Sequence, residues 1–179
     1  MSNQIIISEP KIVENETTIE YIYKINKDDV FIKLDTNYKN FISNSSNASL
    51  VSIILPAMKN NQNVFIDGKV SYTLSKNIDS IQNLLLKVVR NLNKVKFNIA
   101  ETYNEDILNN DPVVITGFSA GVDSYVTLQE YFINPKTPTK LTHLLFNNLI
   151  YKDNVANDKF IDNKRIADKL NLPLIETKT

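Results

Sequence analysis

The feature that most constrains this chain is the stretch 111–132, whose pattern predicts a strand, a tight loop and a helix. The β-branched run at 113–115 has the continuous apolar character of a strand buried on both faces, as in a parallel sheet. A helix start is indicated near Asp123. Two of the chain's three glycines, Gly117 and Gly121, bracket the loop. Because the chain contains so few glycines, we expect a positive φ or close approach of the backbone to a ligand at these two positions.

The loop has the composition of an anion-binding turn. A glycine-containing turn that enters a helix leaves backbone N–H groups unpaired, and the helix dipole adds partial positive charge at the same point. Ser119 and Ser124 can donate hydroxyl hydrogen bonds to phosphate oxygens. Asp123 can cap the helix or hold a magnesium ion that neutralises a polyphosphate. The residues therefore predict a phosphate site.

Residues 119–124, Ser-Ala-Gly-Val-Asp-Ser, resemble the SGGxDS loop of the PP-loop family, the N-type ATP pyrophosphatases of the adenine nucleotide alpha-hydrolase group. The resemblance covers about residues 111–179. It implies that the loop grips the β- and γ-phosphates of ATP, and that the enzyme attaches AMP to an oxygen of a small substrate and releases pyrophosphate. The nucleotide-binding residues it implies are Ser119, Ala120, Gly121, Val122, Asp123 and Ser124, with Asp123 as the candidate magnesium ligand.

The loop departs from the family pattern at Ala120, where the family usually has glycine. A methyl group fits there if φ is negative, but it narrows the approach of a phosphate. This departure favours a first alternative, in which the chain is a non-catalytic nucleotide-binding or assembly module.

A second parallel strand is expected at 141–146, with its carboxyl end on the same side of the sheet as the loop. In the resembled family this strand end holds adenine, mostly through backbone groups, which implies Phe146 and Asn147 as contacts to the base. A helix at about 154–170 and a third strand at 174–176 follow. This order predicts an α/β fold, the first half of a doubly wound parallel sheet with three strands side by side.

The half sheet would leave an open, apolar edge on the strand 113–118. The resembled family has further strands beyond this edge. Either the amino-terminal β region covers this edge, or a partner chain or a further C-terminal segment completes the sheet, and we favour the latter two.

The preceding residues predict a small α+β region at 1–103, a polar linker at 104–111 and the PP-loop-like half domain at 112–179. Within the α+β region, we expect a helix at 78–92 whose apolar stripe is core, and a turn at Asp67 and Gly68. The expected strands are 5–7, 18–25, 30–34, 49–58 (stopped by Pro56), 64–66 and 95–99.

A second alternative is a serine hydrolase, because residues 117–121 also match the G-x-S-x-G elbow with Ser119 as nucleophile. Such a nucleophile needs a base, and His143 is the chain's one histidine. It falls on the very next strand, whereas α/β-hydrolases place the histidine late in the chain. We therefore expect His143 to be a strand residue near the sheet edge with a satisfied ring nitrogen.

Composition bears on several classes of function, and RNA binding is unsupported by it rather than excluded. Lysine plus arginine and aspartate plus glutamate both number 20, so no net field indicates binding to nucleic acid or to an anionic membrane. The absence of cysteine removes disulfides, thiolate zinc sites and persulfide chemistry on this chain. No apolar run approaches about 18 residues, and no signal peptide is recognisable, so we expect a cytoplasmic protein.

Overall fold

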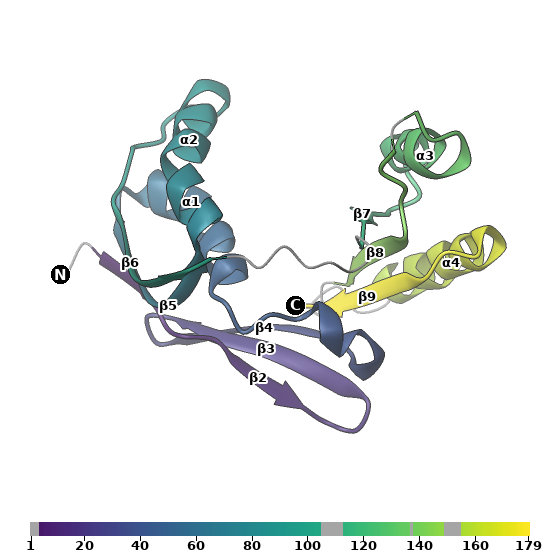
Figure 1. Cartoon of the computed structure of the whole chain (residues 1–179), viewed down its shortest axis with the longest axis horizontal. Coiled ribbons are helices and arrows are strands. Elements are labelled where there is room, and N and C mark those ends of the chain that lie inside the picture. The colour runs from purple at the N-terminus through teal and green to yellow at the C-terminus, as the bar shows by residue number, and fades with distance from the viewer. Residues whose placement is uncertain (1–3, 105–112, 137, 149–154) are drawn as a thin grey trace. The chain divides into compact units, whose positions relative to one another are not determined.

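The structure, a computed structural model, describes residues 4–104, 113–136, 138–148 and 155–179 (Figure 1). Its contacts divide the chain into two compact units. Unit 1 comprises residues 1–13, 20–31 and 42–108, and unit 2 comprises residues 14–19, 32–41 and 109–179. Strands β3 (Thr18–Ile25) and β4 (Asp28–Asp35) therefore contribute residues to both units. The expected linker at 104–111 lies, apart from Asn104, outside the described residues.

Unit 1 combines strands with two helices. In its sheet the strand order is β6-β5-β1-β3, with β5 parallel to β1 and β6, and β1 antiparallel to β3. The helices α1 and α2 both pack against β5 and against each other. The new elements are β1 (Gln4–Ile7), β2 (Lys11–Glu14, paired with β3), α1 (Asn47–Asn60), β5 (Asn63–Ser71), α2 (Tyr72–Val88) and β6 (Phe97–Tyr103).

The expected strand at 49–58 is wrong, because these residues belong to α1, which contains Pro56 within the helix. The buried positions of α1 recur with helical spacing and include Leu50, Ile53 and Ala57. Val51 and Leu55 are also apolar, although they are 57% and 43% exposed. Apolar residues on both sides of the helix hide its period in the sequence, so the run resembles a buried strand.

The expected turn at Asp67 and Gly68 is also wrong, since β5 continues through both residues with a register shift between Ile66 and Lys69. A Cβ atom at Gly68 would lie 2.3 Å from the Oγ of Ser46. Gly68 is therefore required by close packing inside a strand rather than by a turn.

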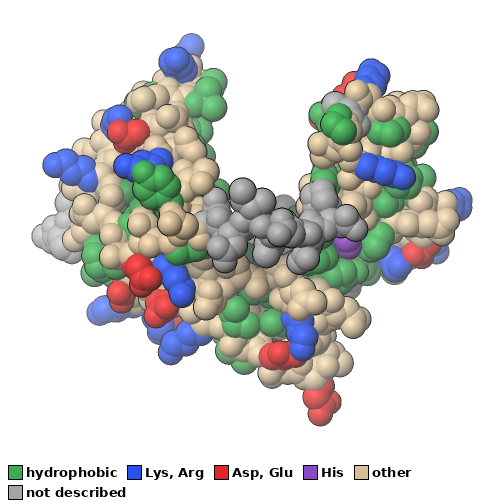
Figure 2. Space-filling model, viewed as in Figure 1, with side chains coloured by type: hydrophobic (Ala, Val, Ile, Leu, Met, Phe, Trp, Pro, Cys, Tyr) green, Lys and Arg blue, Asp and Glu red, His purple; other side chains and the backbone are tan. Residues whose placement is uncertain are grey.

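The helix expected at 78–92 begins earlier and ends earlier, as α2. The side chain of Ser71 caps it by accepting a hydrogen bond from the backbone N–H of Leu74 at 3.3 Å. Ile78 is buried, but Leu84 and Val88 are 61% and 69% exposed, so the expectation that the whole stripe is core is wrong. Figure 2 shows hydrophobic side chains at the surface of this region.

Unit 2 is built on three neighbouring parallel strands, as expected. The strand order is β4-β9-β8-β7, where β7, β8 and β9 are parallel and β4 is antiparallel to β9. The remaining elements are the 3₁₀-helix η1 (Thr36–Phe41), β7 (Ile115–Gly117), α3 (Val122–Leu128), the π-helix η2 (Gln129–Ile133), β8 (His143–Asn148), α4 (Val155–Leu170) and β9 (Leu174–Lys178). The chain is thus a mixed α/β protein in which strands pair largely in parallel.

The core of unit 2 lies on one face of this sheet. Leu128 of α3 and Ala167 of α4 share one buried cluster with Leu144 and Phe146 of β8. Ile115 belongs to the opposite face and is 41% exposed, and Val113 is 48% exposed. The expectation of a first strand buried on both faces is therefore wrong, because both crossover helices cover the same face of the sheet.

Among the described residues, the helices are all too short or too polar to cross a lipid bilayer.

Candidate functional site

The loop after β7 is anchored at Phe118. Its backbone N–H donates to the carbonyl of Leu145 on β8 at 2.8 Å, and its carbonyl accepts from the Nδ2 of Asn163 on α4 at 3.2 Å. The Phe118 side chain is 2% exposed, and its ring meets that of Tyr125 edge to face at 5.9 Å. Strand β8, helix α4 and the core therefore fix the residue from which the loop departs.

Two of the predicted phosphate ligands are brought together. The backbone N–H of Ser119 donates to the Oγ of Ser124 at 3.2 Å, and the two hydroxyl oxygens are 3.3 Å apart. Ser119 is exposed, whereas Ser124 is 8% exposed. The hydroxyl group of Ser119 is thus accessible, and the buried hydroxyl group of Ser124 lies within hydrogen-bonding distance of it.

Ala120 has a φ of 54°. The condition under which a methyl group fits there, a negative φ, is therefore not met. For Gly117 and Gly121 the positive φ is wrong, because no described glycine has one, whereas close approach to a ligand stays a prediction. The other described non-glycine residues with positive φ are all asparagines, which adopt this conformation more readily. Ala120 therefore stores backbone strain of about 1–2 kcal/mol within the predicted site.

Helix α3 starts at Val122, with Gly121 at the N-cap position. No side chain caps this helix start. Asp123 is exposed in the first turn, and its carbonyl accepts from the Oγ1 of Thr127 at 3.0 Å. Glycine has no side chain that could cap the first N–H groups of this helix.

A hollow of about 350 Å³ opens beside the loop, at the carboxyl ends of β7 and β8. It brings Ser119 together with Phe146 and Asn147, the two residues predicted on the second strand. It is lined by Gly117, Phe118, Ser119, Leu145, Phe146 and Asn147, and so does not include the predicted residues 120–124.

Phe146 and Asn147 have different roles in this hollow. The Phe146 ring is 8% exposed and packs against the ring of Phe160 at 5.8 Å, so it belongs to the core. Asn147 is exposed, and its Oδ1 accepts from the Oγ1 of Thr177 at 3.2 Å. A ligand here would meet the backbone of Phe146 and the side chain of Asn147.

His143 lies away from Ser119. It begins β8 opposite Ile115, whereas Ser119 follows the other end of β7. Its Nδ1 is 2.9 Å from the Oγ1 of Thr142, and its ring meets that of Phe41 at 5.2 Å. Partial burial lowers the pKa of His143. This geometry is unfavourable for a Ser119–His143 catalytic pair.

The part of the chain that the structure describes contains no group of three or more histidine, aspartate or glutamate side chains able to hold a metal ion. Magnesium needs few protein ligands, since it often takes one or two carboxylates with phosphates and water. The exposed carboxylate of Asp123 therefore fits a magnesium ion that arrives with a polyphosphate, but not an independent metal site.

Asn163 is a site residue that the sequence pattern did not reveal. It is 2% exposed and holds the carbonyl of Phe118. The sequence feature that could have identified Asn163 is its position as a polar residue in a helical stripe with Phe160 and Ala167. A buried amide is retained in such a stripe when it satisfies a specific backbone group.

Comparisons of this chain with protein-family models, with curated proteins and with solved structures find no match. The resemblance to the PP-loop family therefore rests on residues 119–124 and on the strand, loop and helix that carry them.

Proposed function

We propose that the loop 119–124 binds the phosphates of ATP together with magnesium, and that the chain serves AMP-forming activation of an oxygen on a small substrate. In this proposal β7, β8 and β9 are the first half of a PP-loop-like doubly wound sheet. The observation that carries it is the hollow at the carboxyl ends of β7 and β8, which joins Ser119 to Phe146 and Asn147. Ligands of open parallel sheets bind at this end of the strands.

The proposed roles follow from the local chemistry. The Ser119 hydroxyl and the N–H groups at the start of α3 would donate to phosphate oxygens, with Ser124 supporting Ser119. Asp123 would hold the magnesium ion. The backbone of Phe146 and the side chain of Asn147 would contact the base. ATP supplies the adenylyl group and the pyrophosphate leaving group, and these residues position them and neutralise their charge.

The non-catalytic alternative is favoured by two observations. Ala120 keeps a methyl group in the loop at a φ of 54°, and β7 is last in the strand order of unit 2, so one of its edges pairs with no other described strand. In that alternative the loop binds a nucleotide without turnover, and a partner chain or further segment pairs with β7 to complete the sheet.

Calorimetric titration of the chain with magnesium-ATP, tripolyphosphate and adenosine tests the proposal. We expect ATP and tripolyphosphate to bind and adenosine to bind much more weakly, because the phosphates provide most of the contacts. Ser119→Ala and Asp123→Ala should each weaken ATP binding by about tenfold or more, the loss of one charge-assisted contact. Asp158→Ala is the matched control, since Asp158 is the exposed first-turn acid of α4.

Absence of ATP binding by the folded chain would refute the phosphate site. If Ser119→Ala and Asp123→Ala both left the ATP affinity unchanged, ATP would bind at a site other than this loop. ATP binding without pyrophosphate release, once candidate acceptors are supplied, would favour the non-catalytic alternative.

A further inference from the structure

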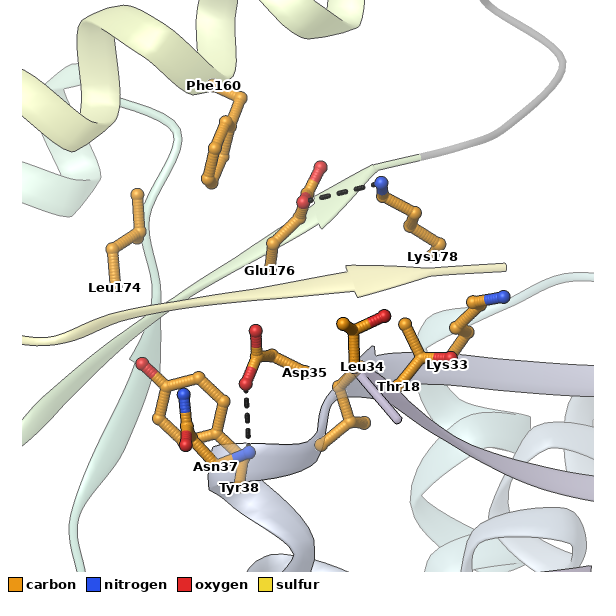
Figure 3. A pocket seen from close by; sticks show the side chains of 11 residues that line it. Thr18, Lys33, Leu34, Asp35, Asn37, Tyr38, Phe160, Leu174, Glu176 and Lys178 are labelled. Atoms are coloured by element: carbon orange, nitrogen blue, oxygen red, sulfur yellow. Dashed lines mark hydrogen bonds and ion pairs between the residues drawn. The ribbon is translucent and has the colours of Figure 1, made fainter. Parts of the chain in front are cut away.

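A second cavity of about 350 Å³ lies within unit 2, between the β4 and η1 segment on one side and β9 with α4 on the other. Figure 3 shows three zones along it. Leu174, Phe160 and Tyr38 lie at one end, Asp35 and Glu176 in the middle, and Lys33 and Lys178 at the other end. None of the residues that line it lines the hollow beside Ser119.

Strand geometry explains this arrangement of charge. Lys33 of β4 and Lys178 of β9 are direct antiparallel partners, so their side chains share one face of the sheet. Because side chains two residues apart point to the same face, Asp35 and Glu176 lie on that face about 7 Å further along each strand. The two strands thus place a pair of ammonium groups beside a pair of carboxylates.

Both carboxylates are held in place. The Oε1 of Glu176 accepts from the Nδ2 of the buried Asn148 at 2.7 Å, and its Oε2 is 3.6 Å from the Nζ of Lys178. The Oδ1 of Asp35 accepts from the backbone N–H of Asn37 at 2.8 Å. Since these contacts come from the protein itself, the acidic zone is preorganised before any ligand enters.

The apolar end provides a wall for a hydrophobic group. Leu174 is 6% exposed, and Phe160 and Tyr38 are each partly buried. Burial of an apolar ligand group against such a wall is favourable in proportion to the area removed from water.

We propose that this cavity binds a free α-amino acid with an apolar side chain. The lining carries two positive and two negative side chains, so a ligand that is neutral overall but carries both charges fits better than an anion or a cation alone. Its ammonium group would meet Asp35 and Glu176, its carboxylate would meet the lysines, and its side chain would pack at the apolar end. The volume lies at the small end of the range for ligand sites.

Calorimetric titration of the full chain with L-phenylalanine, phenethylamine and 3-phenylpropanoate tests this proposal. These probes share the aromatic body, but phenethylamine lacks the carboxylate and 3-phenylpropanoate lacks the ammonium group. L-phenylalanine should bind with a dissociation constant of about 1 mM or below, and each analogue at least about tenfold more weakly.

Two variants locate the site. Asp35→Asn keeps an oxygen for the N–H of Asn37, and Lys178→Met keeps the side-chain stem, so both should fold and both should weaken L-phenylalanine binding about tenfold or more. The matched controls are Asp162→Asn and Lys164→Met on α4, whose charged groups are exposed and paired outside the cavity. Their binding should equal that of the unsubstituted chain.

Three results would overturn the proposal. They are no heat from L-phenylalanine up to about 10 mM, equal binding of L-phenylalanine and either analogue, and unchanged binding in both cavity variants. The probes contain no phosphate, so these results are independent of ATP binding by the loop.

Discussion

Gly68 in β5 and Ala120 in the loop after β7 differ in opposite ways from what is usual for glycine and alanine: the glycine does not have a positive φ, whereas the alanine does. At Gly68 φ is not positive, but a Cβ atom would lie 2.3 Å from the Oγ of Ser46, so the missing side chain serves close packing. At Ala120 φ is 54°, but the side chain is retained and packs against the core cluster of unit 2. At Gly68 the absence of a side chain therefore serves packing, whereas at Ala120 a left-handed residue keeps a methyl group whose burial offsets part of its strain.

The largest expected effect is that of Gly68→Ala. Overpacking against the buried Ser46 should lower the free energy of unfolding by about 2 kcal/mol, measured by chemical denaturation. The Oγ of Ser46 is buried without a hydrogen-bond partner, so Ser46→Ala alone should be neutral or stabilising. The double variant should recover most of the loss. A double variant as unstable as Gly68→Ala would show that another contact makes glycine necessary.

Ala120 should respond in a way that depends on side-chain shape. Ala120→Gly relieves left-handed strain but loses a packed methyl group and gains unfolded-state freedom, so stability should change by less than about 1 kcal/mol. Ala120→Val should cost about 2 kcal/mol, because a β-branched residue is strongly disfavoured at positive φ. Equal stability of the two variants would contradict the left-handed conformation of this residue.

The smallest effect concerns His143. Burial lowers its folded-state pKa below its ordinary value of 6.5, so the unfolded chain binds a proton more readily. This contribution to stability is present above about pH 6.5 and is lost as the pH falls toward the lowered pKa. His143→Gln should therefore make the free energy of unfolding depend less steeply on pH, as measured by denaturation curves taken between about pH 5 and 8. If the pH dependence of the free energy of unfolding were unchanged in this variant, it would have to come from other titratable groups.

The sequence predicted unit 2 better than unit 1, for physical reasons. The parallel strands β7, β8 and β9 alternate with helices whose apolar spacing is regular, and this order leaves few topologies. In unit 1, the apolar residues Val51 and Leu55 on the exposed side of α1 hide the helical period of the hydrophobic pattern. Gly68 suggested a turn, although it lies within the strand β5. Such features depend on partners distant in sequence, as Gly68 depends on Ser46.

The candidate site was predictable in part. The sequence placed Ser119 and Ser124 at one site, and their hydroxyl oxygens are 3.3 Å apart, although Ser124 belongs to α3 rather than to the loop. The conformation of Ala120 and the support from Asn163 could not be derived, because both depend on how α4 and the core pack against the loop.

The central claim, that the loop 119–124 binds the phosphates of ATP, is tested most directly by the melting temperature of the chain with and without magnesium-ATP. Ligand at about a hundred times its dissociation constant adds roughly 2.7 kcal/mol, which raises the melting temperature by several degrees. We predict this rise for the unsubstituted chain and for Asp158→Ala, and its loss in Asp123→Ala. No rise in the folded, unsubstituted chain, or the same rise in all three proteins, would contradict the claim.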